Sequence, residues 1–222
     1  MECPKVSLSS ATDPTAFELT DGGKVQPQGT QRLFFLLHGD PTGGGFDCRG
    51  ITELLGPDQL LYAVPPSTPR RAGDILTIDG MAAAHIAALR TVQPRGPYRL
   101  GGYSLGGLVA FEMAHQLRRA GEAVEMLLLV DSRAPAARQK WQWLRPQEQA
   151  YTPAWYDGRI DLVQALPTGR VPPDATLGWG RLAREVVPQF PQTSHLSLAV
   201  THLPAILREA LRRVSAEGTG RR

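Results

Sequence analysis

The sequence predicts an α/β fold in which helices flank a mainly parallel sheet. Short apolar segments typical of strands alternate with segments that carry apolar residues at helical spacing, and this alternation indicates βαβ crossovers. A serine between glycines lies where a predicted strand meets a predicted helix, which agrees with the same fold class. The chain has 222 residues, a length that α/β folds commonly form as one domain with a sizeable core.

The predicted domain covers residues 32–214, with a peripheral segment at each end. Residues 1–31 are polar and contain an Asp-Gly-Gly turn, so we expect an arm or hairpin of the same domain. Residues 215–222 are polar and contain glycine, and we expect a disordered tail there. The predicted strands are residues 33–37, 59–64, 98–103, 124–130 and 159–164, and the predicted helices are residues 81–91, residues 105–114 and the segment after His195.

The two kinds of element differ in how their apolar residues are spaced. The strands at residues 33–37 and 124–130 are nearly continuous apolar runs, which is typical of strands buried on both faces of a parallel sheet. The segment at residues 105–114 keeps apolar residues three and four positions apart until Gly121 ends the helix. Helices are therefore expected on both faces of the sheet.

Ser104 lies in the pentapeptide G-Y-S-L-G, at the corner between the strand 98–103 and the helix 105–114. The flanking glycines leave room for crowded backbone that a Cβ would obstruct, so the serine is held in a tight, exposed turn. The backbone N–H of Leu105, at the helix N-terminus, faces any oxyanion that forms beside Ser104. This pattern predicts a nucleophile elbow with Leu105 as an oxyanion donor.

Partners for the serine follow it in the chain. Asp131 comes directly after the strand 124–130, and His195 lies in a loop before the C-terminal helix. The order Ser, Asp, His is that of serine hydrolases built on an α/β sheet. All three residues fall at strand ends or in loops, where parallel sheets bind ligands. The sequence thus predicts Ser104, Asp131 and His195 as a catalytic triad.

Other histidines compete with His195 for the role of general base. His85 and His115 lie in helical patterns and are expected to be solvated or half-buried helix residues, and His38 is expected to shape the loop after its strand. His202, at the start of the last helix, is the main rival. We prefer His195 because a general base must reach back over the elbow from a loop.

One other aspartate competes with Asp131 for the role of the acid. Asp174 follows two prolines, and it would occupy the position after the next strand that many hydrolases use for this residue. We favour Asp131 because it ends a buried strand directly, and Asp174 stays open as the alternative.

Residues 97–114 closely resemble the product-releasing thioesterase domains of nonribosomal peptide and polyketide synthases, which belong to the α/β-hydrolase superfamily. The resemblance extends more weakly over residues 33–214 and includes a Gly-rich loop, an aspartate turn and a histidine loop. It implies an α/β-hydrolase fold and a serine thioesterase that needs no metal or cofactor. Met1 favours a free-standing editing enzyme, and the elbow favours a terminal domain, so both stay open.

The resemblance also implies a substrate and a partner. The substrate would be an acyl, peptidyl or polyketide chain on the phosphopantetheine of a carrier protein or synthase module. Release would proceed through an acyl-Ser104 intermediate, by hydrolysis or by cyclisation. Where the family shows a simpler His-Pro-Ala-Gly-Gly loop, this chain has the additional Gly39 and Asp40. We assign the second oxyanion donor to the N–H of Thr42, because Pro41 has no N–H.

The chain departs from the family in the segment after Asp131. The family inserts a long helical lid there, whereas this chain has only residues 133–157, a Pro-rich and aromatic segment. These aromatic side chains could pack over the apolar end of the sheet or form an acyl-binding wall, and one cluster can do both. The aromatics are Tyr151 and Tyr156, and the candidate substrate-binding residues Trp141, Trp143 and Trp155.

Composition bears on partners and location. The formal net charge is only +3, without an aromatic-interleaved basic stripe, so nucleic acid is not expected. No apolar stretch approaches membrane-spanning length and no signal-peptide core is present, which predicts a cytoplasmic protein without a membrane partner. The two cysteines give no disulfide framework and no metal-ligand spacing. Helix arginines at 118 and 119, or at 208, 212 and 213, could meet an acidic carrier, although solvated helix surface is the simpler interpretation.

Two other functions are compatible with parts of the pattern. Residues 101–105 match the G-G-x-S-L tag of carrier proteins, in which the serine bears phosphopantetheine. Carrier domains are small helical bundles, so a buried strand before the motif argues against this function, and the aspartate and histidine would be unexplained. The second alternative is a carboxylesterase acting on small oxygen esters, which rates on thioesters and nitrophenyl esters would distinguish.

Overall fold

A computed structural model of the chain describes residues 24–26, 29–37, 48–64, 77–135 and 151–219. Within these residues seven strands form one sheet, in which β1 pairs antiparallel with β3 and every other neighbouring pair is parallel. The predicted mainly parallel sheet is confirmed. In spatial order the strands are β1 (Lys24–Gln26), β3 (Gln59–Val64), β2 (Gln31–Leu37), β4 (Tyr98–Tyr103), β5 (Val124–Val130), β6 (Tyr156–Val163) and β7 (Ala183–Gln189).

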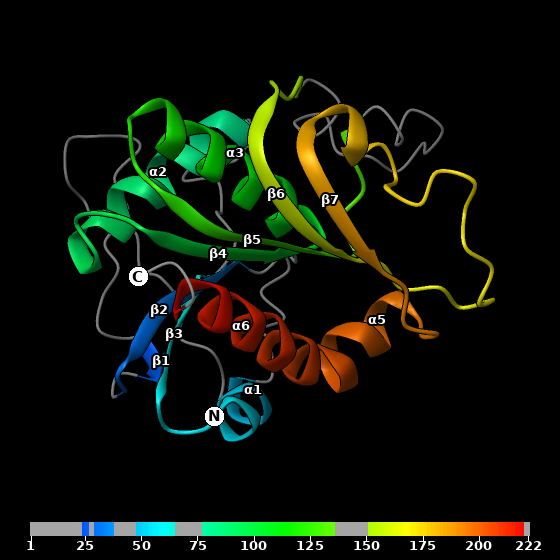
Figure 1. The fold of residues 1–222 in the computed structure, drawn as a ribbon, viewed down its shortest axis with the longest axis horizontal. Helices are drawn as coiled ribbons and strands as arrows, with labels where there is room; N and C mark the ends of the chain where they lie inside the picture. Colours follow the sequence, from blue (N-terminus) through cyan, green and yellow to red (C-terminus); the bar gives the residue numbers. More distant parts are fainter. Residues whose placement is uncertain (1–23, 27–28, 38–47, 65–76, 136–150, 220–222) are drawn as a thin grey trace, which may run out of the picture.

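Helices cover both faces of the sheet (Figure 1). α2 (Ile78–Val92) and α3 (Leu105–Arg119) lie on one face, and α1 (Cys48–Leu55) and α6 (Leu203–Thr219) lie on the other. Thr77 caps α2, because its side chain accepts a hydrogen bond from the N–H of Gly80. The three layers explain why residues 34–37 of β2 and 126–130 of β5 are apolar without alternation.

Two hydrophobic cores lie on the two faces of the sheet. Phe35 and Leu37 of β2 pack on the side of α2 and α3, whereas Phe34 and Leu36 pack on the side of α1 and α6. All four side chains are buried, and their division follows the two-residue period of a strand. The sheet between α3 and α6 is therefore a rigid support for the residues at its edges.

The carboxyl ends of β4, β5 and β6 lie in line. Tyr103 is the register partner of Val130, and Val130 is the register partner of Val163. The three strands are parallel, so the residues that follow them emerge at the same edge of the sheet. These residues are Ser104, Asp131 and Gln164.

The C-terminal part of the chain is one helical run. It begins with α5 (His195–Ser197), continues through the π-helical η4 (Leu198–His202) and ends with α6. Ser194 caps it, since its Oγ accepts a hydrogen bond from the N–H of Ser197 at 3.2 Å. The sequence predicted that His195 lies in a loop. In the structure it is instead the first residue of a helix.

Other elements also differ from the sequence prediction. β6 begins at Tyr156 rather than at residue 159, and β7 was not predicted. Pro188 breaks the apolar pattern of β7, but this strand lies at the edge of the sheet, where proline is tolerated. α6 continues through Thr219, so residues 215–219 are helical and not part of a disordered tail; Val214 just before them still packs against the core. Among the described helices, none combines the length and the apolar character needed to cross a membrane.

Candidate active site

Ser104 occupies a strained corner between β4 and α3. Its backbone has a φ of 55° and a ψ of −118°, a region that residues other than glycine rarely adopt. The turn is held by a hydrogen bond from the N–H of Ser104 to the carbonyl of Val130 at 2.9 Å. The side chain is partly exposed and makes no capping bond to α3. The predicted nucleophile elbow is therefore present as a backbone geometry.

Two glycines make this corner possible. A Cβ on Gly102 would lie 2.1 Å from the carbonyl oxygen of Gly106, and one on Gly107 would lie 2.6 Å from Oγ of Ser132. Real Cβ atoms do not approach so closely, so a side chain at either position would push α3 away from the sheet. Leu105 begins α3, and its N–H belongs to the first helical turn, where backbone donors have no partner within the helix.

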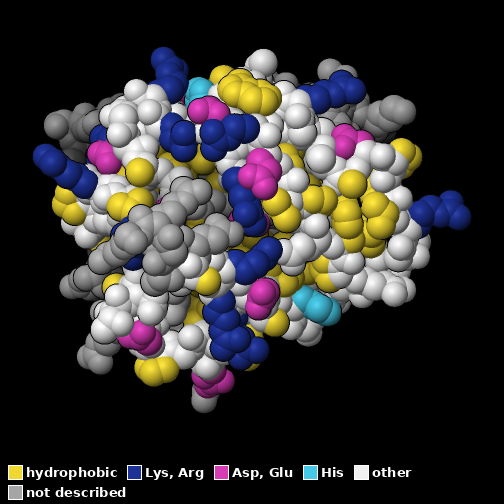
Figure 2. Space-filling model, in the orientation of Figure 1, with side chains coloured by type: hydrophobic (Ala, Val, Ile, Leu, Met, Phe, Trp, Pro, Cys, Tyr) yellow, Lys and Arg dark blue, Asp and Glu magenta, His cyan; other side chains and the backbone are white. Residues whose placement is uncertain are grey.

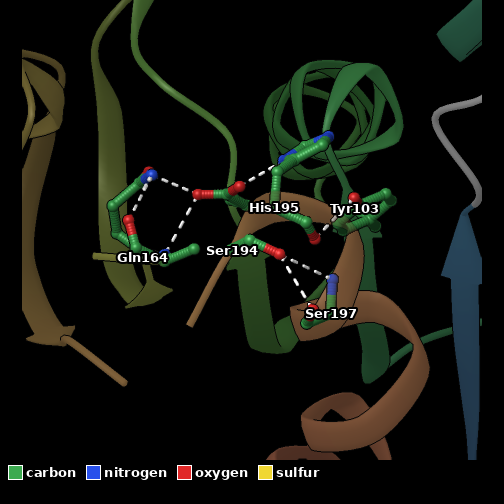
Figure 3. A network of polar contacts seen from close by, with 7 residues as sticks. Tyr103, Gln164, Ser194, His195 and Ser197 are labelled. Carbon is green, nitrogen blue, oxygen red and sulfur yellow. Dashed lines mark hydrogen bonds and ion pairs between the residues drawn. The ribbon is translucent and has the colours of Figure 1, made fainter. Parts of the chain in front are cut away.

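Asp131 links the end of β5 to His195. Its Oδ2 contacts Nδ1 of His195, while its Oδ1 accepts hydrogen bonds from the amide of Gln164 and, at 3.1 Å, from the N–H of Ala165 (Figure 3). The carboxylate side chain is only 4% exposed. Because a carboxylate accepts, Nδ1 of His195 carries the proton and Nε2 is left as the basic nitrogen. This is the orientation that a general base requires.

Tyr103 connects His195 to the elbow. Its hydroxyl donates a hydrogen bond to the backbone carbonyl of His195 at 3.0 Å, and its ring stacks on the imidazole with 4.7 Å between the centroids. Tyr103 immediately precedes Ser104 in the chain. The structure therefore brings His195 and Asp131 to the edge of the sheet at which Ser104 lies.

The profile of the thioesterase domain family matches residues 54–218. The chain belongs to this family. The predicted resemblance and the predicted enzyme class are therefore confirmed, and the protein is a thioesterase. A carrier protein is excluded, because Ser104 follows a strand of an α/β sheet rather than standing in a helical bundle.

Relatives of this thioesterase include synthases. The chain is 48% identical over 109 residues to the non-reducing polyketide synthase crz7 of Cladonia metacorallifera, and this match covers 49% of the chain and 5% of the synthase. It is 37% identical over 110 residues to the dimodular nonribosomal peptide synthase of Bacillus subtilis, covering 49% of the chain and 4% of the relative. The chain therefore spans under a tenth of the length of these relatives.

A solved structure supports the assignment over nearly the whole domain. The NocB thioesterase domain, in covalent complex with a fluorophosphonate nocardicin G analog, is 28% identical and superposes with a TM-score of 0.67. The superposition covers 86% of this chain and 97% of the NocB domain. The thioesterase fold thus extends well beyond the elbow motif.

Asp174, the alternative acid, has a different task in this thioesterase. Its exposed carboxylate accepts hydrogen bonds from the hydroxyl and N–H of Thr176, at 2.6 and 2.9 Å, and from the N–H of Gly178 at 2.8 Å. The Thr176 hydroxyl and these backbone donors hold the pKa of Asp174 below its usual value. Asp174 thus stabilises the turn before η3 (Trp179–Arg181), and Asp131 is the carboxylate that meets His195.

Within the described residues, the other three histidines lie in helices. His202 sits in η4 with its Nδ1 2.7 Å from the hydroxyl of Thr201. His85 is fully buried in α2, where desolvation lowers its pKa to about 4, so it is more buried than we predicted. His115 is half-buried on α3, 3.9 Å from the Glu112 carboxylate. His38 lies outside the described residues, as do Thr42, Trp141 and Trp143.

Trp155 does not lie at the predicted site. It immediately precedes β6, and its ring is exposed. Since β6 is parallel to β4 and β5 within the sheet, Trp155 lies at the amino edge, a full strand length, roughly 25 Å, from the carboxyl edge where Ser104 lies. The structure therefore does not bring Trp155 to the edge of the sheet at which Ser104 lies.

Two further aromatics of the shortened segment belong to the core. Tyr151 is buried and its hydroxyl donates to the Glu112 carboxylate at 2.7 Å, while Tyr156 packs edge-on against Phe111. Desolvation, reinforced by the Glu112 charge, raises the pKa of Tyr151 far above its usual value. Both side chains belong to the core on the α2 and α3 side of the sheet, and Tyr156 is itself the first residue of β6.

Gln164 is a site residue that the sequence prediction missed. It was expected only as the end of a strand, yet its amide donates to Asp131 from a position that is 5% exposed. The signal in the sequence was its place directly after an apolar strand. The spatial order of the strands, which puts β6 beside β5, was needed to use that signal.

Replacing Gln164 with leucine is expected to lower kcat about tenfold to a hundredfold with little change in KM. The buried carboxylate would lose a charge-assisted hydrogen bond, worth about 1.5–3 kcal/mol, and would hold His195 less firmly. Steady-state kinetics on a thioester substrate measures the effect.

Gln116→Leu is the matched control, because Gln116 donates to the Glu112 carboxylate at 2.9 Å on α3. Both variants should lose stability in thermal unfolding, but only Gln164→Leu should lose kcat. Equal kcat losses would assign Gln164 a structural role alone.

Proposed function

We propose that this thioesterase releases an acyl, peptidyl or polyketide chain from a phosphopantetheinyl carrier protein, by hydrolysis through an acyl-Ser104 intermediate. The observation that carries the proposal is the contact of Asp131 with Nδ1 of His195 beside the elbow of Ser104. The synthase relatives and the NocB thioesterase domain support a carrier-bound substrate.

The proposed reaction begins with attack by the serine. The Oγ of Ser104 attacks the carbonyl carbon of the thioester, and Nε2 of His195 takes the proton that Oγ loses. Asp131 stabilises the imidazolium that forms. The N–H groups of Leu105 and Thr42 receive the oxyanion, and each contributes about 3 kcal/mol to the transition state.

This attack gives a tetrahedral intermediate, and two steps follow: its collapse to the acyl-enzyme and the hydrolysis of that ester through a second tetrahedral intermediate. The C–S bond breaks and the phosphopantetheine sulfur leaves with the proton from His195, which gives the acyl-Ser104 ester. Water attacks this ester while His195 takes its proton, and the proton returns to Oγ as the acid product departs. A nucleophile within the chain that replaced the water would give a cyclic product.

Hydrolysis is favoured by the exposure of the base. The side chain of His195 is 53% exposed, and that of Ser104 is partly exposed. Water therefore reaches the atoms that would activate it, whereas a site committed to cyclisation benefits from excluding water.

The arginines considered for carrier docking are not part of the proposal. Arg118 pairs with Asp157 at 3.9 Å and lies over the Tyr156 ring, and Arg213 is 4.0 Å from Asp161. Both helices carry these arginines away from the carboxyl edge, by about 20 Å along α3 and about 15 Å along α6. On the face seen in Figure 2, basic side chains stand beside acidic ones rather than forming one patch.

The proposal is tested with an acyl chain that carries its own nucleophile, loaded on a phosphopantetheinyl carrier protein. Intact mass spectrometry should show the enzyme gaining the mass of the acyl group, and chromatography should show mainly linear acid. The same acyl group as a nitrophenyl ester should turn over less efficiently than the thioester. Absence of an acyl-enzyme would contradict the covalent route, and mainly cyclic product would contradict hydrolysis.

A further inference from the structure

Tyr103 holds His195 from two directions at once. The phenol hydroxyl bonds the backbone carbonyl of His195 at 3.0 Å, and the phenol ring lies against the imidazole at an interplanar angle of 25°. Tyr103 itself is 5% exposed, whereas more than half of the His195 side chain is exposed. The buried ring of Tyr103 thus lies against an imidazole that is largely open to solvent. Figure 3 shows the hydrogen bond from the Tyr103 hydroxyl to His195.

The contact with Asp131 alone leaves one motion of the imidazole unrestricted. Asp131 holds the ring at Nδ1, but the terminal torsion of histidine is broad, so the ring can swing about this contact and carry Nε2 away from Ser104. A ring stacked on the face of the imidazole opposes that swing. Misplacement of a reacting group by about 1 Å can cost a hundredfold in rate.

The hydroxyl of Tyr103 acts on the backbone rather than on the ring. The carbonyl that it binds belongs to the first residue of α5, and the π-helical η4 follows directly. Such π-helical turns often lie at functional sites, where they adjust the direction of a helix. The bond from Tyr103 therefore fixes the start of this helical run against the strand that carries the serine.

We propose that Tyr103 is a positioning residue that sets the imidazole of His195 toward Ser104, through its ring and its hydroxyl together. The inference rests on the proposed function, because it assumes that His195 is the general base. It assigns a chemical task to the variable residue before the serine in the G-x-S-x-G motif. Tyr103 touches neither substrate nor the transferred proton in this role.

The same strand offers a matched control. Tyr98, at the other end of β4, is also buried, and its hydroxyl donates to the backbone carbonyl of Gln93 at 3.1 Å. Tyr98→Phe and Tyr103→Phe each remove a buried hydroxyl that donates to a backbone carbonyl. A purely structural role predicts the same phenotype for both.

The experiment measures kcat, KM and the thermal midpoint for four variants, with an acyl N-acetylcysteamine thioester as the substrate. Both phenylalanine variants should lower the midpoint by similar amounts. Only Tyr103→Phe should lower kcat, by about tenfold, with KM unchanged. Tyr103→Leu, which also loses the ring contact, should lower kcat about a hundredfold. Tyr103→Phe keeps the ring and should therefore retain about ten times the kcat of Tyr103→Leu.

The fourth variant, His195→Ala, separates this inference from the function on which it rests. If His195→Ala is inactive and Tyr103→Phe keeps the kcat of Tyr98→Phe, the positioning role is wrong and the proposed mechanism stands. If His195→Ala retains turnover within tenfold of the wild type, the proposed mechanism itself fails. A loss confined to KM in Tyr103→Phe would also overturn the inference, since it would indicate substrate binding.

Discussion

Replacing Ser104 with alanine is expected to abolish thioester turnover and formation of the acyl-enzyme. The variant has no Oγ to attack the carbonyl, and removal of the nucleophile from such sites costs at least about ten-thousandfold in kcat. The fold should be kept, because the Ser104 side chain is partly exposed and makes no capping bond. Turnover assays, intact mass and thermal unfolding together test this prediction.

Ser132→Ala provides the control for this serine. Ser132 follows Asp131, and its hydroxyl is buried with no hydrogen-bond partner within the described part of the structure. Its removal should leave turnover and the acyl-enzyme mass unchanged. Residual turnover of Ser104→Ala within tenfold of the wild type would mean that another group attacks the thioester.

Replacing Asp131 with asparagine is expected to lower kcat about ten-thousandfold. An amide at this position no longer fixes the proton on Nδ1 of His195, so Nε2 loses its basic lone pair in part of the molecules. It also cannot balance the positive charge of the imidazolium. Stopped-flow or steady-state measurements on a thioester substrate give the ratio of rates.

Asp174→Asn tests the same prediction from the other side. Within the described structure, the Asp174 carboxylate contacts only residues of its own turn. Replacing this carboxylate with the amide of asparagine should therefore leave kcat unchanged. If Asp174→Asn proves damaging and Asp131→Asn does not, the acid is the later aspartate.

The parts of the site that could be predicted are the positions of Ser104 and Asp131 at the ends of strands, because local sequence patterns specify them. The glycines around Ser104 and the buried strand before Asp131 predicted where each residue would leave the sheet, and the structure brings Asp131 against His195. The catalytic roles of these residues stay predictions. Ser194 and Ser197 carried a helix-start signal that would have placed His195 at a helix N-terminus.

The missed features depend on spatial order. The contact of Gln164 with Asp131 exists because β6 lies next to β5, and no local pattern specifies that neighbour. Trp155 was proposed as a substrate-binding residue because it is aromatic, without regard to its place before a strand. A residue just before a parallel strand lies at the amino edge of the sheet, opposite the edge that binds ligands. β7 was missed because Pro188 hid an edge strand.

The backbone at Ser104 and Asp131 has a consequence for engineering. Both residues have positive φ, 55° and 48°, and glycine adopts such angles without strain. The Ser104 side chain makes no capping bond, so libraries selected only for heat resistance should accumulate glycine at this proposed nucleophile, whereas Asp131 is retained by the hydrogen bonds that it accepts from Gln164 and Ala165. The most robust clones would then be the inert ones, so any such selection has to be coupled to turnover.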